Sequence, residues 1–454
     1  MAIFKKNKTK TVEEALGVKV LSAVELDKFL EACANIYRGK PYWIGDKVKT
    51  VNFANTIAGE IARLTTMNTE VSVDGSARAD WLQGIMDDCE SEWRNWVELG
   101  CALGTLILKP TEDSLDILTP NRFFILGAYN GDITDIVFRD CVFDPEREIY
   151  YTRLERHQLD EVYTITNRVY VGYAPYDLDH EVSIEVSPWN GINDEVVAEG
   201  VEHMLFGVFR FPGANNLDMS SPLGLPCFAK AVEELKDLDI AYSLNAKEIA
   251  QSAKVVMLDS DRLTPNGRIG ADRRDDIVAN FGLPDYVKLV DGDGINDVYR
   301  EINPSLNTEE RLNGINNLLS QIGFKCGFSN GYFVFNQKTG MVTATQVESD
   351  DRRTLQMVND VRTQFKACVE GLIYAYDRLA DAYGWAPYGE YTIAFDFADL
   401  TINPDEDRAR WFSFVTRGYI PFWRYLVMFE GFTEDEAKEI AQDEEEVTLF
   451  PEAE

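Results

Sequence analysis

The chain has 454 residues, in which 44 Lys and Arg stand against 77 Asp and Glu, so its formal net charge is −33. A hydrophobic fraction of 45% excludes general disorder, and the length allows about three domains. The charge also excludes a protein that grips nucleic acid, because neutralising phosphates requires a basic surface.

Cysteine and histidine give no sign of a disulfide framework or a metal site. The seven cysteines are scattered and never take CxxC spacing, which is typical of reduced, buried thiols. His157, His180 and His203 do not combine with other ligands in a zinc pattern. The opening MAIFKKNKTK has no apolar stretch behind its lysines, and no uncharged run reaches the roughly 18 residues of a bilayer span. We therefore expect no metal, no cofactor, no signal peptide and no membrane segment.

The first half of the chain predicts helices followed by sheet. Apolar residues recur at helical spacing over 24–34 and 51–66, and a tryptophan-rich helix is expected over 79–100. From 103 to about 211 the pattern changes to period-two and continuous apolar runs, separated by turn signals such as YNGD and FDPE. The breaker-rich FPGANNLDMSSPLG then marks a boundary, and a helix is expected over 223–251.

The second half predicts a small module between helices and then a very long helix. AKVVMLDS reads as a strand, helical spacing returns over 308–322, and a glycine-punctuated loop follows. Thr345 and Glu348 form a capping box for a helix of about 38 residues. A strand-like YTIAFDFADLTI and two helical stretches end the chain, the last capped by Thr433 and Glu436.

The sequence contains no complete motif for a serine nucleophile, a calcium loop or a phosphate-binding loop. The GFSNG of residues 327–331 matches the G-x-S-x-G pattern, but no histidine follows residue 203, so the Ser, Asp, His order cannot form. The DGDG of residues 291–294 lacks the later ligands of a calcium loop, and no phosphate-binding GxxxxGK[ST] is present. Because the chain has 77 acidic residues, two of them can always be chosen as a catalytic carboxylate pair, and their spacing gives no evidence for one. A carboxylate-based hydrolase therefore stays open as an alternative, as does a capsid or scaffold protein without a channel.

The order of several segments resembles tailed-bacteriophage portal proteins, closest to the siphophage type of the head–tail connector family. The most specific is TGMVTATQVESDDRRTLQMVNDVRTQF, with its TATxVxS core at 343–349. Other segments are YYTRLERH with YTITNRVY, then FRFPGANNLDMSSPLGLPCFAKAVEELKDLD, and finally WFSFVTRGYIPFWRYL with GFTEDEAKEIAQDEEE. The resemblance covers most of the chain.

This resemblance implies an α+β portal fold with an α/β wing, a long helical stem, a small α/β clip and a helical crown. Carried onto this sequence, the parts are the wing (1–222), stem helix 1 (223–251), the clip (252–302), stem helix 2 (303–323), the tunnel loop (324–342), a long wing helix with a strand (343–404) and a short acidic crown (405–454).

The implied function is structural rather than enzymatic. Such proteins form a homo-oligomeric ring of usually about twelve subunits at one capsid vertex. The ring contacts the major capsid protein and scaffold, docks the large subunit of the terminase motor, and conducts double-stranded DNA without sequence-specific binding during packaging and ejection. It later binds a head–tail adaptor protein. The expected location is the portal vertex of the virion, reached by assembly in the host cytoplasm.

Three groups of site residues follow from the resemblance. The DNA-proximal groups of the tunnel loop are expected to be Lys325, Asn330, Asn336, Gln337 and Lys338, with Lys338 as the cation of the lumen. Candidates for the stem lumen are Glu233, Glu234 and Asp237. Candidates for the face of the clip that meets the terminase and adaptor are Arg268, Arg273 and Arg274. An acidic wall repels phosphate over a Debye length, so DNA slides past it without being held.

Overall fold

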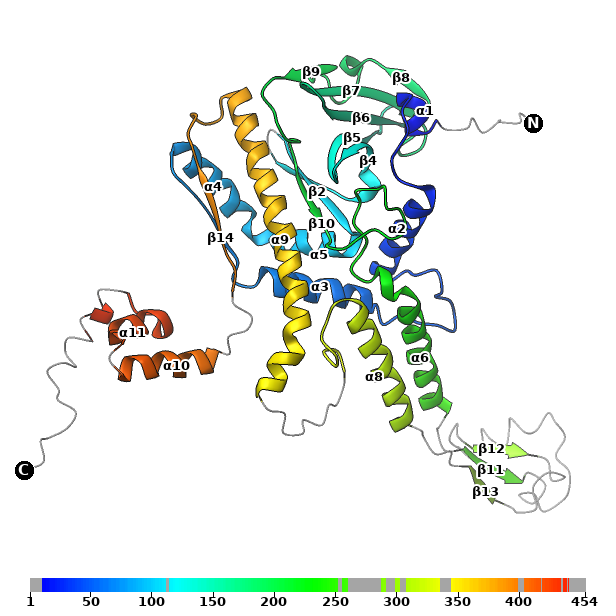
Figure 1. Ribbon diagram of the computed structural model, residues 1–454. Helices are drawn as coiled ribbons and strands as arrows, with labels where there is room; N and C mark the ends of the chain where they lie inside the picture. Colours follow the sequence, from blue (N-terminus) through cyan, green and yellow to red (C-terminus); the bar gives the residue numbers. More distant parts are fainter. Residues whose placement is uncertain are drawn as a thin grey trace, which may run out of the picture. The chain divides into compact units, whose positions relative to one another are not determined.

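The chain forms two compact units, Met1–Asp396 and Phe397–Glu454, which are considered separately. The computed structural model describes residues 10–111, 114–251, 255–259, 287–290, 299–302, 308–334, 344–398, 404–417, 419–433, 436–438 and 440. Helices and sheets are both present, so the α+β class is confirmed (Figure 1). Within these ranges no helix combines the length and the apolar composition that a bilayer span requires.

Five helices precede the first large sheet. They are α1 (Val12–Leu16), α2 (Val24–Tyr37), α3 (Phe53–Thr66), α4 (Ala77–Cys89) and α5 (Trp93–Leu103). The predicted helices at 24–34 and 51–66 are confirmed as α2 and α3. The single helix expected over 79–100 is wrong, because the exposed Glu90–Glu92 forms a 3₁₀ turn between α4 and α5. Before that break, α4 buries Ala79, Leu82 and Met86 and leaves Trp81 only half-buried.

Two antiparallel sheets occupy the region predicted to be sheet-rich. The smaller has the order β10-β2-β3, and the larger has the order β4-β5-β6-β7-β8 with β9 also paired to β7. Their bounds are β2 (Thr105–Pro110), β3 (Leu115–Leu118), β4 (Phe123–Tyr129), β5 (Asp132–Asp144), β6 (Ile149–Leu159), β7 (Tyr163–Gly172), β8 (His180–Val182), β9 (Glu195–Ala198) and β10 (Gly207–Arg210). β6 and β7 form a long hairpin whose register runs from Leu159↔Tyr163 to Tyr150↔Gly172.

The long helix α9 (Ala344–Tyr383) confirms the predicted helix of about that length. It packs across the small sheet (Figure 1). Ile107 of β2, Phe138 of β5 and Ala375 of α9 belong to one buried cluster, so both sheets and the helix share a core. Contact with β10 is close, because a Cβ built on Gly207 would lie 2.3 Å from the carbonyl oxygen of Cys368. Only glycine permits that approach.

A buried arginine fixes the far end of α9. Arg78 of α4 is 1% exposed, and every N–H of its guanidinium finds an acceptor. Its partners are the carboxylates of Asp377 and Asp381 and the carbonyl oxygens of Asp377, Ala386 and Pro387, at 2.6–2.9 Å. The chain then returns as β14 (Thr392–Asp396), which pairs antiparallel with β1 (Glu70–Asp74).

The remaining part of the first unit is a helical hairpin with strands inserted between its helices. α6 (Val232–Gln251) is followed by β11 (Val255–Asp259), β12 (Val287–Val290), β13 (Tyr299–Ile302) and α8 (Thr308–Lys325). β11 lies in the middle, parallel to β12 and antiparallel to β13. The strand predicted in AKVVMLDS is thus confirmed, and so is the helix expected over 308–322.

The helix expected from residue 223 begins instead at Val232. The segment before it is held against the α5–β2 turn, where the N–H of Gly224 donates to Oγ1 of Thr105 and the N–H of Cys227 donates to the carbonyl of Cys101. Gly104 and Gly224 cross so closely that a Cβ on either would lie 2.3 Å from the carbonyl oxygen of the other. These tertiary contacts replace the helical hydrogen bonds.

The second unit contains α10 (Pro404–Thr416) and α11 (Phe422–Glu430). Arg408 of α10 pairs with Glu430 of α11 and donates to the hydroxyl of Tyr425 at 3.1 Å. The predicted capping box after α11 is confirmed, since the N–H of Thr433 donates to the carboxylate of Glu436 at 3.0 Å and the N–H of Glu436 donates back to Oγ1 of Thr433.

Candidate functional site

The candidate stem acids lie on the first turn and a half of α6, but they do not share one environment. Glu233 and Asp237 are exposed, one helical turn apart. Glu234 is half-buried, and its Oε1 lies 2.5 Å from Nζ of Lys325 at the end of α8. Of the three candidate lumen acids, Glu233 and Asp237 are therefore the two with free access to solvent.

Lys325 belongs to the last turn of α8 and not to a loop. The helix extends two residues beyond Gly323, which brings the Lys325 ammonium to Glu234 on the neighbouring helix. A second ion pair, between Arg311 of α8 and Glu248 of α6, joins the same helices nearer their other ends. The structure therefore places Lys325, expected in the tunnel loop, in the last turn of α8.

The glycine-punctuated segment after α8 is packed into the body of the unit as far as residue 334. Phe328 is fully buried and Ser329 is 5% exposed. Oγ1 of Thr354, on α9, accepts the backbone N–H of Ser329 at 2.9 Å and donates to its Oγ at 2.9 Å. Gly327 has a φ of +95°, a left-handed conformation that favours glycine.

Aromatic residues hold the same segment against α3. The ring of Phe333 meets that of Phe53 edge to face at a centroid distance of 5.0 Å, and the hydroxyl of Tyr332 donates to the carboxylate of Glu60. Burial and the negative Glu60 raise the pKa of Tyr332 to about 12. The hydrogen bonds from Arg63 lower the pKa of Glu60, so that carboxylate stays ionised as the acceptor.

These contacts also show whether the serine of the G-x-S-x-G motif can act as a nucleophile. A nucleophilic serine needs an exposed hydroxyl beside a base. Ser329 is instead buried against a threonine, and its hydroxyl completes a hydrogen-bonded pair. The motif is a packed turn, and its serine is not placed as a nucleophile.

The remaining candidate residues divide between an exposed position and positions outside the described residues. Asn330 is exposed at the bend of the segment. Asn336, Gln337 and Lys338, and the clip candidates Arg268, Arg273 and Arg274, lie outside the described residues. Within the described part, the structure brings together Glu234 and Lys325 and leaves the other candidates apart.

A buried polar network under the large sheet was not anticipated. Glu155 accepts from Lys109 at 2.7 Å and from Arg153 at 2.8 Å, while its other oxygen meets Nε2 of His157 at 2.8 Å. Nδ1 of His157 lies 2.6 Å from the hydroxyl of Tyr163. The cationic neighbours hold the pKa of Glu155 well below its usual range against the opposing effect of burial, and burial lowers the pKa of His157. The ion pairs and hydrogen bonds join residues of β2, β6 and β7, so the network is suited to holding strands together.

A second unanticipated contact joins the segment before α3 to α6. Asp239 is 4% exposed, and its carboxylate accepts the indole N–H of Trp43 and the backbone N–H of Val51, each at 2.8 Å. Ser243, one turn further along α6, accepts the backbone N–H of Lys49 at 2.8 Å. The 43–51 segment is thereby fixed along one side of the hairpin.

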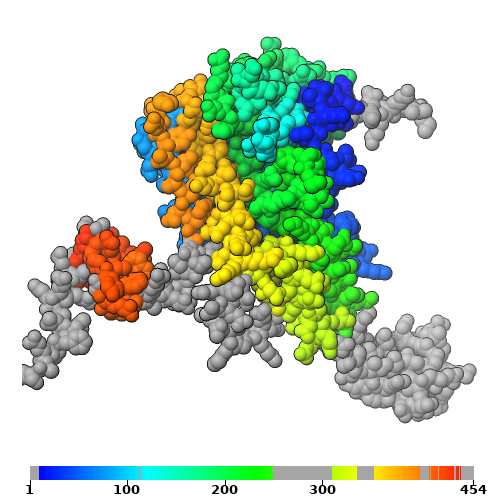
Figure 2. Space-filling view, in the orientation of Figure 1, coloured from blue at the N-terminus to red at the C-terminus, as the bar shows by residue number. Residues whose placement is uncertain are grey.

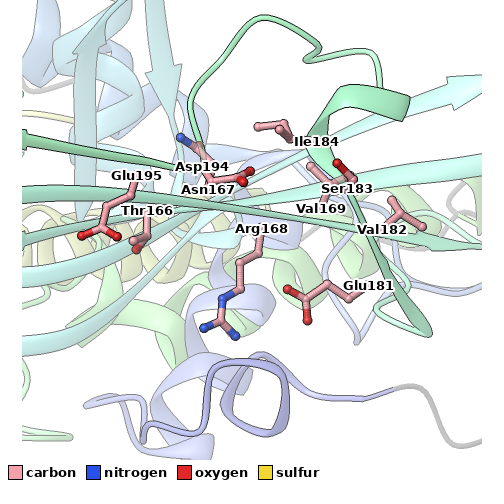
Figure 3. Close-up of a pocket in the computed structure, with 10 residues that line it drawn as sticks. All are labelled: Thr166, Asn167, Arg168, Val169, Glu181, Val182, Ser183, Ile184, Asp194 and Glu195. Carbon is pink, nitrogen blue, oxygen red and sulfur yellow. The ribbon is translucent and has the colours of Figure 1, made fainter.

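Open cavities lie around this framework. One of about 330 Å³ lies between α2 and the start of α6 and has Cys33, Ile36, Glu234 and Lys325 in its lining. Another, of about 650 Å³, opens at the edge of the large sheet (Figure 3). In the part of the chain that the structure describes, no three His, Cys, Asp or Glu side chains are placed to share a metal ion.

Solved structures similar to this chain include two from gene transfer agent particles. No protein-family model matches this sequence, and no curated protein matches it. A chain from the virion of a native gene transfer agent particle is similar over 92% of this chain and 97% of its own length, with 11% identity and a TM-score of 0.45. A chain from the neck of a native gene transfer agent particle, computed with C12 symmetry, is similar over 83% of this chain and 89% of its own, with 9% identity and a TM-score of 0.41.

Proposed function

We propose that this chain is the portal protein of a tailed-phage-like particle. In this proposal a ring of copies, about twelve, occupies one capsid vertex, docks the large terminase subunit, and conducts double-stranded DNA during packaging and ejection. The same ring contacts the major capsid protein and scaffold and later binds a head–tail adaptor. The proposal rests first on the order in which several portal-like segments follow one another along the sequence. The most specific of these segments is TATQVES at 343–349.

The structural observation that carries it is the uncovered end of the α6/α8 hairpin. Leu235 and Leu238, near the body of the unit, are each 3% exposed, whereas Tyr242 and Leu244, further along α6, are 46% and 50% exposed. Figure 2 shows the surfaces of α6 and α8, in green and yellow-green, open on the face in view. Two helices cannot cover each other on all sides, so a neighbouring copy packed against the hairpin would cover these apolar side chains.

A ring of identical copies supplies that partner. In a heterologous contact, one side of a subunit meets a different side of the next, and the arrangement closes when the rotation divides a full turn. The apolar residues would then face neighbouring hairpins, and the exposed Glu233 and Asp237 are the stem acids available to the lumen. A lumen lined by such acids would let DNA pass without gripping it.

The DNA-proximal residues are now proposed to be Asn336, Gln337 and Lys338, with Asn330 at the edge of the group. Lys325 leaves this group because it pairs with Glu234. Replacing Lys338 with alanine should reduce packaging or retention of DNA in particles. If Lys338→Ala particles package and retain DNA as the parent does, that residue has no role in the lumen.

Negative-stain electron microscopy of the purified chain tests the assembly directly. Rings of about a dozen subunits with a central hole are expected. Compact monomers in every condition tried would contradict the proposal and leave the hydrolase alternative, while closed or extended assemblies without an axial channel would favour the scaffold alternative. Duplex DNA should bind the isolated ring poorly even at low salt, because the net charge of each copy is −33.

A matched pair of variants tests whether the exposed apolar residues of α6 form the contact between subunits. Leu244→Glu places a charge on an exposed apolar position of α6, so it should abolish rings while leaving the fold of the single chain intact. Lys247→Glu makes an equally exposed charge change less than one turn away and should leave ring formation largely unchanged. Rings of normal abundance from Leu244→Glu would exclude this surface as the subunit contact.

A further inference from the structure

A cavity of about 380 Å³ lies between α2 and β4, which is the edge strand of the large sheet. Its walls are mainly apolar and include Leu30, Leu103, Phe123, Ile125 and Leu223. Protein sites for small molecules typically have volumes of about 300 to 1,000 Å³ and apolar walls that carry a few polar groups. The cavity has the size and wall composition of such a site, and it plays no part in the proposed stem or tunnel.

Arg139 brings a positive charge to one wall of this cavity. It lies two residues beyond Val137 on β5, and Val137 is paired with Phe124 of β4, so the side chains of Arg139 and Phe124 share one face of the sheet. Nη2 of Arg139 donates to the carbonyl oxygen of Asn121 at 2.8 Å, and the guanidinium carbon lies 5.0 Å from the centre of the Phe124 ring. Asn121 and Phe124 both line the cavity, so the guanidinium lies at its wall.

This guanidinium has no counterion among the described residues. The Tyr176 ring is centred 4.2 Å from its carbon atom, and its Nε is buried without an acceptor in the described part of the chain. Arg153 and Arg156, on the neighbouring β6, each pair with an aspartate, at 2.8 and 2.5 Å. Arg139 forms no such pair with any residue that the structure describes.

A cation without a counterion is costly in such surroundings. Burial lowers the pKa of Arg139, and the aromatic rings beside it supply no full negative charge. An anion in the cavity would offset that cost. The planar guanidinium is suited to a carboxylate in particular, which it can bind through two parallel hydrogen bonds.

The other charged groups of the lining narrow the choice of anion. Asp27 and Glu31 of α2 line the cavity, together with Arg38. Asp27 accepts from Oγ of Ser22 at 2.8 Å, and Glu31 is exposed. The two carboxylates would repel a doubly charged phosphate more than a singly charged group, and a phosphate would leave the apolar walls uncovered. A single carboxylate on an apolar chain meets both conditions.

We propose that this cavity binds a small molecule that carries one carboxylate on an apolar chain. The carboxylate accepts from the guanidinium of Arg139, and the chain lies against Leu30, Phe123 and Leu223. All the lining residues belong to one copy, so occupation of the site does not depend on ring formation.

Titration of octanoate into the full chain, followed by saturation-transfer NMR, tests the site. Arg139→Gln should raise the Kd for octanoate at least about tenfold. The matched control, Arg147→Gln, changes an exposed arginine on the turn between β5 and β6 and should leave the Kd unchanged. Equal Kd values for the parent and Arg139→Gln would overturn the proposal.

A second variant tests the cavity without removing the arginine. Ala34→Trp places a large side chain on the cavity wall formed by α2, so it should abolish octanoate binding while Arg139 is intact. Its control, Ala382→Trp, adds the same side chain at an exposed position of α9 and should bind octanoate as the parent does. Octanoate binding that persists in Ala34→Trp would overturn the proposal.

Two further probes test the class of ligand. Octan-1-ol has a chain of the same length without the carboxylate, and it should bind at least about tenfold more weakly than octanoate. Inorganic phosphate at a concentration equal to that of octanoate should not displace it. Equal affinity for octan-1-ol, or displacement by phosphate, would show that the cavity does not select a carboxylate on an apolar chain.

Discussion

Nζ of Lys325, in the last turn of α8, lies 2.5 Å from Oε1 of Glu234, in the first turn of α6. The two residues are 91 positions apart, so their contact joins the two ends of the hairpin that meet at the body of the unit. Because both side chains keep access to water, the pair contributes modestly to stability.

A double-mutant cycle should measure this contribution. Lys325→Met, Glu234→Gln and the double variant are expected to give a coupling of about 0.5 kcal/mol in urea unfolding, within the range of partly exposed ion pairs. The coupling should shrink in 1 M salt. No measurable coupling at low salt would mean that the pair is not maintained in solution.

Replacing Arg78 should be far more damaging. Arg78→Met leaves Asp377 without its buried partner and leaves three backbone carbonyl oxygens without their donor, and we expect a loss of about 3 to 5 kcal/mol in the free energy of unfolding. Arg78→Lys should recover little, because an ammonium cannot reproduce the planar fork of five donors.

The matched control for Arg78 is Arg63→Met, since Arg63 is exposed and pairs with Glu60 on the same helix. Its loss should stay below about 1 kcal/mol. Urea unfolding followed by circular dichroism measures the free energy of unfolding of each variant. Equal losses from Arg78→Met and Arg63→Met would contradict the conclusion that all the N–H groups of the Arg78 guanidinium are hydrogen-bonded.

Two glycine substitutions should act in opposite directions. Gly207→Ala would place a methyl group 2.3 Å from the carbonyl oxygen of Cys368, so it should displace α9 and lower the melting temperature. Gly84→Ala, inside α4, meets nothing within 4 Å and should stabilise the helix by about 0.5 to 1 kcal/mol. Thermal unfolding distinguishes them, and a stabilising Gly207→Ala would refute the close packing of α9 on β10.

The buried His157 predicts acid sensitivity. Burial lowers its pKa in the folded protein, so between the folded and unfolded values the unfolded chain binds more protons. Stability should therefore fall as the pH drops through about 6.5. Glu155, whose pKa is also lowered, adds a further loss as the pH falls below its ordinary value near 4.5.

His157→Gln tests the first part of this acid response. The variant should be less stable at pH 8 because it loses the ring between Glu155 and Tyr163, but its stability should change less between pH 7 and 5.5. A parent and variant with parallel pH profiles in that interval would show that His157 does not control the response.

The order of elements followed from the sequence where local pattern and packing agree. The period-two runs of residues 103–211 became two antiparallel sheets, and the apolar spacing after Thr345 became α9. The same period would have placed Arg153, Glu155 and His157 on one face of β6. These three side chains are buried because Lys109 and Tyr163, from other strands, contact that face. The sequence of β6 alone does not predict this burial.

The candidate site was predicted less well, for a related reason. Gly323 and Gly327 indicated a loop from residue 324, but α8 continues through Lys325, whose ammonium meets the distant Glu234. Ser329, Tyr332 and Phe333 likewise took their places from partners on α9 and α3. Residue 223 was assigned to a helix because its apolar spacing is helical, yet the crossing of Gly104 and Gly224 holds that segment in another conformation.

The forty-residue α9 has a mechanical consequence for the packed segment after α8 that is tied to it. Contacts with β2, β10, α3 and α4 hold much of the helix against the body, and the Ser329–Thr354 pair ties it to the end of the packed segment after α8. A helix resists bending more than a connecting loop does. A load applied at the Ser329–Thr354 pair would therefore be carried along the stiff helix to its contacts with Gly207 and Arg78.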